Sequence, residues 1–480
     1  MEQSGMIASQ SNTRSEFSRI EGLALFLGCI AIQLVTEVMT QWGAYFYSPP
    51  SGGGSIVYVA IGLAGTMFVV TYIVSALSDP IIALWSDRTD TRGRWRLVPL
   101  EGRRRPFIFW GSIGVTITGV LYWHPPLAHA SMLNFLFGTA VLCLHWGLFV
   151  SMCTTPFNAL GPEIARTKEG RVRIGTWIAA GMIVGLAVAE IAPGILVDLL
   201  SPVRTEPLPE DGIVPVSPEG FQRMAILFSA VALLFFQFTV WTVRERYHSE
   251  RQSVITPPLA IILQTLRNTV FLRYILIFFL FNLGYLAVQR VMPYWAKVGL
   301  HGTESTVSLL MAPYIVFAML ALVLTDRLSK RLPVKWMIFI SLAIITSGLP
   351  MMYVIGVCGL SDNVKTLLGA ALFAYCGIGQ GMQYVLLTPM IGEIIDYDER
   401  RSGERREAIY QSVSGLAWKG AQALSVYVAT LTMGFWGNSI ENPTGIFLVG
   451  PIAGLFGICA MAVCWTYPVL HVARKGPGEE

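Results

Sequence analysis

The chain has 480 residues, of which 54% are hydrophobic and 13% are charged, and its formal net charge is +4. Because an ordinary soluble domain carries about 25% charged residues, this composition excludes a soluble enzyme and indicates a protein whose surface mostly faces lipid. The small net charge gives no indication of a nucleic-acid partner.

Apolar runs long enough to cross a bilayer recur along almost the whole chain. The hydrocarbon core is about 30 Å thick and needs about 20 apolar residues in a helix. The runs lack the alternation of barrel strands, and lipid offers no partner to an open strand edge, so each run is predicted to be a helix. Twelve runs fit, at approximately residues 22–47, 56–84, 106–123, 132–158, 174–197, 221–243, 270–291, 304–325, 334–356, 366–391, 408–434 and 444–469.

Basic residues gather in the loops that follow the even-numbered runs. The loops on the other side are poor in Lys and Arg, and the longest, residues 198–219, is Pro-rich and acidic. Cytoplasmic loops carry the excess of Lys and Arg, so we predict a multi-pass plasma-membrane protein, in the bacterial inner membrane, with both termini cytoplasmic. The densest basic loop follows the second run and holds Arg88, Arg92, Arg94, Arg96, Arg103, Arg104 and Arg105.

The loop arginines have a second interpretation besides orientation. Bidentate pairing of arginine with carboxylates requires specific geometry, whereas orientation requires only the charge. Networks of this kind can latch the cytoplasmic side when the protein faces outward. The acidic partners available at helix ends are Asp87, Glu163, Asp396 and Glu407.

Two short sequence patterns recur about half a chain apart. Ser86-Asp87-Arg88 at the end of the second run is echoed by Thr325-Asp326-Arg327 at the end of the eighth, and the segment 155–164 is echoed by 388–394. Parallel repeats related by an axis along the membrane normal are the major facilitator arrangement, in which substrate binds near the midplane between the halves. We therefore predict an all-α integral membrane fold of twelve transmembrane helices in two six-helix bundles. The bundles are residues 1–243 and 266–480, with a polar, basic cytoplasmic linker at 244–265.

The chain carries no pattern that indicates an enzyme or a bound cofactor. The spans contain no metal-ligand cluster, no nucleophile beside a base and no phosphate loop. The seven cysteines lie in or near apolar runs, without the paired spacing of a disulfide or zinc site. The Ser-rich start is followed by no small-residue cleavage site, which predicts that no signal peptide is removed. We expect no metal and no cofactor other than a coupling ion.

Four segments carry a likeness to a known family. They are SDPIIALWSDR at 78–88, GRRRPFIFWG at 102–111, TPFNALGPEI at 155–164 and EIIDYDERRSGERREAIYQSVSGLAWKGAQAL at 393–424. Together they resemble the glycoside-pentoside-hexuronide:cation symporter family, whose best-known member is the melibiose permease. The segments lie in both halves, so the resemblance implies a cation-coupled sugar transporter over the whole transport core.

The resemblance carries some of the family's functional positions over to this chain and not others. Asp79 matches the second of the two aspartates that bind the coupling cation on the second span, and Lys419 matches the lysine of the eleventh. At five other positions this chain departs from the family's pattern: Gln33 for the acidic sugar-binding residue, Ser75 for the first aspartate, Thr154 for the aspartate of the fourth span, Asn158 for the aromatic sugar platform and Ala179 for the sugar-contacting arginine. These departures disfavour a sodium site built from several carboxylates and a melibiose-like substrate.

Asp79 and Lys419 also stand out without the resemblance. An ionisable side chain within the hydrocarbon costs several kcal/mol unless it is paired or hydrated. Asp79 precedes Pro80, which frees a backbone carbonyl for a cation or water, and Lys419 lies about three turns into its span, where a carboxylate partner is expected. Two interpretations stay open: a static Asp79–Lys419 bridge, or a bridge that protonation or substrate binding at Asp79 weakens.

Other polar residues within the spans have two interpretations each. Glu37 lies one turn after Gln33 on the same helix face, where it can bind substrate or release protons outward, or simply face water in an outward vestibule. Glu190 has the same alternatives. His145 can relay protons, since imidazole titrates near neutral pH, although a lone histidine on an apolar helix is more often a packing residue.

Two further groups lie in the second half of the chain. Gln380, Gln383 and Tyr384 make a polar face on the tenth span, which suits a hydroxyl-rich ligand. Gln289 and Arg290 lie near the outer end of the seventh span, where they contribute to an extracellular gate or, for Arg290, extend to the interface.

These observations predict a secondary active transporter of a small polar solute, most simply a glycoside or sugar derivative, driven by a proton or, as the alternative ion, sodium. Its partners are the solute and the lipid bilayer, with no nucleic acid and no predicted oligomeric state. A lysolipid or other amphiphile carried by the same fold is one alternative, and a non-transporting membrane receptor is another. The predicted substrate contacts are Gln33, Glu37, Thr154, Asn158, Gln380, Gln383 and Lys419, and the predicted cation-coupling residues are Asp79, Ser75 and Thr154.

Overall fold

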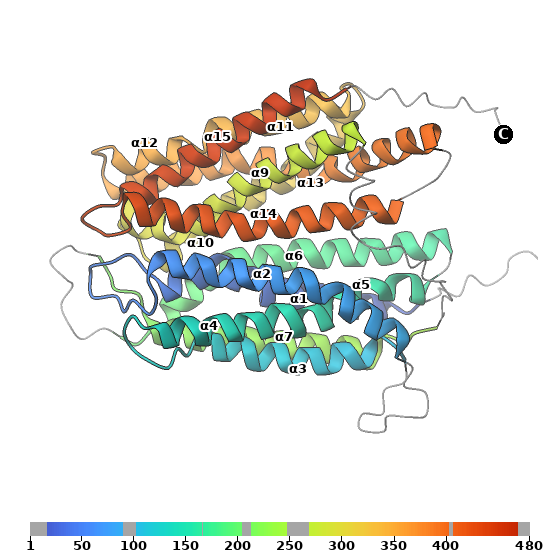
Figure 1. Cartoon of the computed structure of the whole chain (residues 1–480), viewed down its shortest axis with the longest axis horizontal. Coiled ribbons are helices and arrows are strands. Elements are labelled where there is room, and N and C mark those ends of the chain that lie inside the picture. Colours follow the sequence, from blue (N-terminus) through green and yellow to red (C-terminus); the bar gives the residue numbers. More distant parts are fainter. Residues whose placement is uncertain are drawn as a thin grey trace, which may run out of the picture.

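The computed structural model describes residues 17–89, 102–165, 167–203, 213–246, 268–402 and 407–468. In this part of the chain twelve helical rods lie side by side in one bundle, with α1–α7 in the lower part and most of α9–α15 in the upper part of the view (Figure 1). The first six rods are α1 (Arg19–Tyr47), α2 (Ile61–Arg88), α3 (Arg105–Tyr122), α4 (Met132–Leu144) continued by the π-helix η1 (His145–Val150) and α5 (Ser151–Ile164), α6 (Lys168–Leu200) and α7 (Pro218–Thr242). The second six are α9 (Thr269–Tyr294) continued by the π-helix η2 (Trp295–Gly299), α10 (Glu304–Ser329), α11 (Val334–Gly348) with α12 (Met351–Val357), α13 (Asp362–Ser402), α14 (Glu407–Trp436) and α15 (Thr444–Thr466).

Each predicted apolar run falls on one of these rods. Ten rods are long and apolar enough to cross a membrane, and α3 and α14 complete the bundle beside them. Large apolar side chains point outward, including Leu77 and Leu234, each 67% exposed, and Leu367, 70% exposed. A bundle surface of this kind suits hydrocarbon rather than water. The predicted all-helical, twelve-span membrane architecture is confirmed.

Local sequence explains where two helices begin at the end of the bundle where the first and last described residues, Phe17 and Pro468, lie, called the terminus end below. Ser18 and Glu21 form a capping box at α1, in which Ser18 Oγ accepts from the Glu21 amide (3.1 Å) and Glu21 Oε2 from the Ser18 amide (2.9 Å). Glu245 caps α3 by accepting the backbone N–H groups of residues 103–105 at 2.7, 2.8 and 2.9 Å. A carboxylate at a helix N-terminus also complements the helix dipole.

The described arginines of the loop before α3 contact the first six rods. Arg104 pairs with Asp87 and donates through Nη1 to Ser86 Oγ (2.7 Å). Arg105 Nε donates to the Val240 carbonyl (2.7 Å). These contacts tie α2, α3 and α7 together. Of the other residues of the predicted latch, Asp396 lies on α13. Arg92, Arg94, Arg96 and the side chains of Glu163 and Glu407 lie outside the described residues, as does the linker beyond residue 246.

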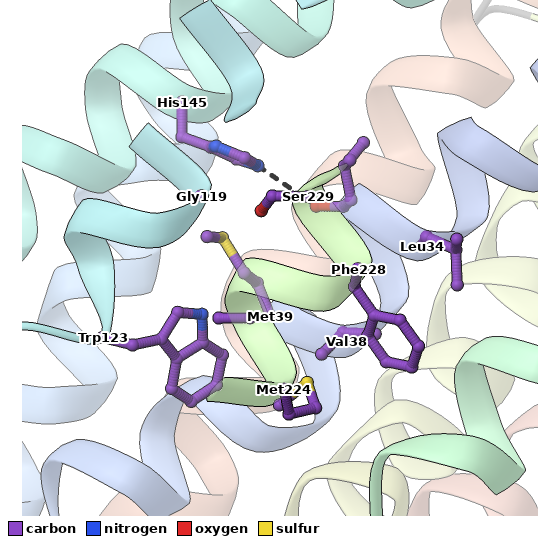
Figure 2. A pocket seen from close by; sticks show the side chains of 11 residues that line it. Leu34, Val38, Met39, Gly119, Trp123, His145, Met224, Phe228 and Ser229 are labelled. Carbon is purple, nitrogen blue, oxygen red and sulfur yellow. Dashed lines mark hydrogen bonds between the residues drawn. The ribbon is translucent and has the colours of Figure 1, made fainter. Parts of the chain in front are cut away.

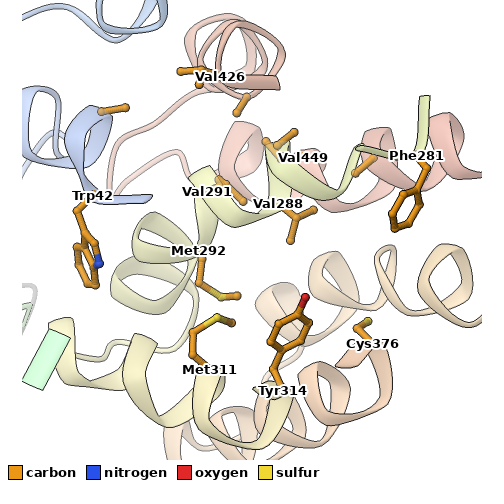
Figure 3. Close-up of a cluster of buried hydrophobic side chains, with 14 of the residues drawn as sticks. Trp42, Phe281, Val288, Val291, Met292, Met311, Tyr314, Cys376, Val426 and Val449 are labelled. Atoms are coloured by element: carbon orange, nitrogen blue, oxygen red, sulfur yellow. The ribbon is translucent and has the colours of Figure 1, made fainter. Parts of the chain in front are cut away.

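A buried apolar cluster runs through both halves. Figure 3 shows Trp42 of α1 on one side of it and Val288 of α9, Met311 of α10 and Val426 of α14 on the other. A second cluster, which includes Leu25 and other residues of α1, α3, α5 and α7, packs these helices of the first half against each other. Burial of this core therefore holds the halves together as well as each half internally.

The halves meet along two close helix pairs, α2 with α14 and α6 with α10. Glycine makes each approach possible. A Cβ added to Gly65 on α2 would lie 1.9 Å from Thr430 Oγ1 on α14, and one added to Gly194 on α6 would lie 2.2 Å from the Glu304 carbonyl on α10. At the far end of the bundle, opposite the terminus end, hydrogen bonds to backbone carbonyls also join the halves. Ser51 N donates to the Asn438 carbonyl (3.2 Å), and Tyr294 Oη donates to the Ser48 carbonyl (2.9 Å).

Candidate functional site

Asp79 of α2 and Lys419 of α14 form an ion pair between the two halves. Lys419 Nζ also donates to the carbonyl and to the hydroxyl of Ser75, at 2.9 Å each. Ser151 Oγ of α5 donates to the other carboxylate oxygen of Asp79. The ammonium group of Lys419 is therefore held by three oxygens of α2: a carboxylate, a hydroxyl and a carbonyl. The same three oxygens are the kind of ligands that a bound cation would use.

The ion pair is partly open to water. The side chain of Asp79 is 37% exposed and that of Lys419 is 23% exposed. On the far-end side, Tyr72 of α2 (4% exposed) and Gln422 of α14 (6% exposed) are buried. These two buried side chains cover the pair on its far-end side.

The predicted residues of α5, Thr154 and Asn158, lie on the helix that contacts this ion pair, but another residue of that helix makes the contact with Asp79. Thr154 Oγ1 donates to the Val150 carbonyl of its own helix (2.9 Å), and Asn158, one turn further on, is exposed. The residue that contacts Asp79 is Ser151, which the sequence did not single out. The π-helix η1 directly precedes it, and a π-turn adds a residue per turn and so rotates the following helix face.

Arg290 forms a second polar cluster on the far-end side of the pair. It is 1% exposed, and its Nη2 donates to Gln422 Oε1 and, at 3.5 Å, to Tyr72 Oη. Its Nε and Nη1 have no hydrogen-bond partner among the described residues. The suggestion that Arg290 extends to the membrane interface is wrong, because the guanidinium lies between α2, α9 and α14.

Two carboxylates face this region from the first half. Glu37 of α1 lies within electrostatic reach of Arg290 without forming an ion pair with it in the described structure. Glu190 of α6 is 3% exposed, and its Oε1 accepts a hydrogen bond from Gln289 Nε2 of α9. Gln33 lies one turn before Glu37, where its Cγ would be 3.0 Å from a Cβ on Gly185 of α6. The sequence placed Gln33 and Glu37 on one face but gave no sign of Glu190 opposite Gln289.

The polar residues of α13 lie near the same carboxylates. Gln380 and Gln383 are each 4% exposed, and Tyr384 lies one turn after Gln380 on the same helix. Tyr384 is half-exposed and within electrostatic reach of Glu37 and Glu190. Gln380 Oε1 and Gln383 Nε2 are buried without a partner in the described part of the chain. Unpaired buried amide atoms are costly, so they indicate a place for water or for solute hydroxyl groups.

A buried ion pair lies at the far end. Lys297 Nζ of η2 donates to both carboxylate oxygens of Glu304 at 3.0 and 3.2 Å, and the two side chains are 3% and 4% exposed. Tyr45 Oη of α1 donates to the same carboxylate (2.9 Å), so Glu304 links the halves. The sequence did not predict this group because both charges stand beside a loop, where charged residues usually face water.

His145 is fully buried within the first half, away from the interface between the halves. Its Nδ1 lies 2.8 Å from Thr118 Oγ1 and its Nε2 lies 3.1 Å from the Val35 carbonyl. A carbonyl only accepts, so this network assigns the proton to Nε2. A small cavity beside the ring is lined mainly by apolar side chains such as Met224 and Phe228 (Figure 2). These contacts favour the packing interpretation over a proton relay.

Replacing His145 with Phe should lower stability but leave transport intact. The change removes the hydrogen bonds of the ring to the Val35 carbonyl and to Thr118, which contribute about 0.5–1.5 kcal/mol each. Thr118 Oγ1 keeps the Gly114 carbonyl as its partner (2.8 Å). Thermal unfolding of the purified variant checks the loss, and uptake per folded molecule checks transport. His145→Gln, whose amide can still donate to Val35, should lose less. A tenfold or greater fall in uptake by both variants would support the proton-relay interpretation of His145 instead.

Comparison with known proteins adds to this geometry. Residues 25–468 match a family described as MFS/sugar transport protein. Among curated proteins, the isoprimeverose transporter of Lactiplantibacillus pentosus is 23% identical over 467 residues, covering 95% of this chain and 90% of that protein. An uncharacterized symporter of Bacillus subtilis is 23% identical over 418 residues, covering 84% and 83%. Among solved structures, a D-xylose-proton symporter has a similar fold, with a TM-score of 0.63 and 14% identity over 94% of this chain and 98% of that one.

Proposed function

The chain belongs to the MFS/sugar transport protein family, and from this premise we propose that it carries a glycoside or related sugar derivative across the membrane together with a cation. The family match over residues 25–468 bears out the resemblance seen in the sequence, so the chain is a membrane transporter and not an enzyme. The relatives named as an isoprimeverose transporter and as a symporter support a sugar cargo and a coupled ion. The buried, unpaired amides of α13 favour a hydroxyl-rich cargo over a lysolipid.

The ion pair between Asp79 and Lys419 carries this proposal, because it joins the moving halves through a titratable group. We propose a proton as the coupling ion. Lys419 already fills the cation position beside Asp79 and Ser75, so sodium would have to displace an ammonium group, whereas a proton needs only to neutralise the carboxylate. Protonated Asp79 holds Lys419 less strongly, which loosens α2 from α14.

Alternating access then follows as rocking of the halves, residues 1–243 and 266–480, about the polar residues between them. Solute binds while those residues are reachable from one side, and the proton on Asp79 lets the halves reorient. Ser75 and Thr154 complete the cation site in this proposal. The residues proposed to contact solute are Gln33, Glu37, Thr154, Asn158, Gln380, Gln383 and Lys419.

The terminus end is proposed to face the cytoplasm of a bacterial inner membrane. The described basic residues at that end support this orientation, because cytoplasmic loops are rich in Lys and Arg. They include Arg88, Arg104, Arg171, Arg327, Arg331 and Arg400. In that orientation the closed far end is extracellular, and Asp79 exchanges its proton with the cytoplasm.

Purified protein in vesicles tests the function. Radiolabelled sugars, glycosides, uronides and lysolipids are offered under an imposed proton gradient, an imposed sodium gradient or neither. We expect uptake of at least one glycoside above its equilibrium level under the proton gradient, and its loss when a protonophore is added. Accumulation under the sodium gradient alone would show that the coupling ion is sodium and not the proton. Solute binding without movement under every condition would favour a receptor.

A further inference from the structure

Glu190 is a buried carboxyl group at the junction of the two halves that the proposed coupling pair does not use. It lies on α6, and its one hydrogen bond in the described structure comes from the neutral amide of Gln289 on α9. Its other oxygen, Oε2, is buried and has no partner. A buried carboxylate needs a counter-charge or several donors, and Glu190 contacts neither.

The charges around Glu190 do not compensate for an ionised carboxylate. Its charged neighbours are one acidic residue, Glu37 of α1, and one basic residue, Arg290 of α9. The phenols that face this region, Tyr285, Tyr314 and Tyr384, are neutral. One guanidinium therefore faces two carboxyl groups. A single guanidinium balances only one carboxylate, so one of the two carboxyl groups is expected to be protonated. Glu37 is partly exposed whereas Glu190 is 3% exposed, so we assign the protonated, neutral carboxyl group to Glu190.

We propose that Glu190 binds a proton while the far end is closed and releases it when the far end opens, as a second proton site separate from Asp79. The proposal rests on the proposed transport cycle. Opening the far end separates α6 from α9, so the hydrogen bond from Gln289 breaks and Glu190 meets water. The proton then passes from the carboxyl group to water on that side, and no other bond changes.

Infrared difference spectroscopy on purified protein in vesicles at neutral pH tests this without a transport assay. A protonated carboxyl group has a C=O stretch that a carboxylate lacks, and the band shifts in D₂O. We expect the spectrum of Glu190→Gln to lack one such band that the unmodified protein shows. The substitution is isosteric with the neutral acid, so the variant should fold and unfold at an unchanged or higher temperature.

Glu37→Gln is the matched control, because Glu37 lies in the same cluster but is partly exposed and lies within electrostatic reach of Arg290. The acid band should persist in this variant. A band that persists in Glu190→Gln, or that disappears in Glu37→Gln instead, would overturn the assignment. A wrong proposed function would be recognised by another measurement: the unmodified protein would show no cation-driven uptake in vesicles, whatever the infrared spectra show.

Discussion

Replacing Asp79 with Asn is expected to abolish accumulation of solute against its gradient while leaving exchange of solute across the membrane. Asn keeps the size and hydrogen-bonding capacity of the side chain but cannot take up a proton. Lys419 loses its counter-charge but keeps both contacts with Ser75, and both members of the pair are partly exposed, so the fold should tolerate the change. In vesicles under a proton gradient, the ratio of internal to external solute should fall to about one, the equilibrium value for an uncoupled carrier.

The control for this prediction is Asp326→Asn. Asp326 lies in α10 of the second half, at the position that echoes Asp87, and in its ion pair with Lys330 both side chains are 72% exposed. Loss of this pair should change stability and transport very little. Counterflow, in which preloaded unlabelled solute drives entry of labelled solute, separates loss of coupling from loss of binding. Full gradient-driven accumulation by the Asp79→Asn protein would remove this residue from the coupling mechanism.

Hydropathy located the twelve rods, ten of which are long and apolar enough to cross a membrane, because the bilayer imposes a minimum length and an apolar surface on each helix. It does not fix the helix ends. The predicted tenth run stops at residue 391, whereas α13 continues to Ser402, because a charged helix can extend beyond the hydrocarbon. The π-helices at 145–150 and 295–299 have no local signal, since they arise where packing inserts a residue into a regular helix.

The contacts of the site were predictable only where the chain offered a single partner. Asp79 and Lys419 could be paired because each stands alone in its apolar run and needs an opposite charge. Glu190 with Gln289, and Arg290 with Gln422, could not be paired in this way. Sequence spacing gives the face of each helix, but which faces meet across the halves depends on tertiary packing. For the same reason Ser151 was missed in favour of Thr154.

Replacing Lys297 with Met should open the far end of the protein. The change leaves Glu304, 4% exposed, with Tyr45 as its remaining side-chain partner among the described residues. Removing one member of a buried pair typically costs about 3–5 kcal/mol, because the remaining charge stays uncompensated. The carboxylate regains water most directly if α1 and α10 separate at this end. We therefore expect both a lower unfolding temperature and a larger far-end-open population.

Two further variants separate the charge from the link between the halves. Lys297→Met with Glu304→Gln removes both charges and should recover most of the lost stability, whereas additive losses would mean that the pair is not coupled. Tyr45→Phe removes only the hydrogen bond from the first half. Opening is read from the rate at which a membrane-impermeant maleimide labels a cysteine at position 308, where Ser308 is 3% exposed below Glu304. Faster labelling in Lys297→Met and slow labelling in the double variant are the expected pattern. Equal rates in all variants would show that the buried charge does not hold this end closed.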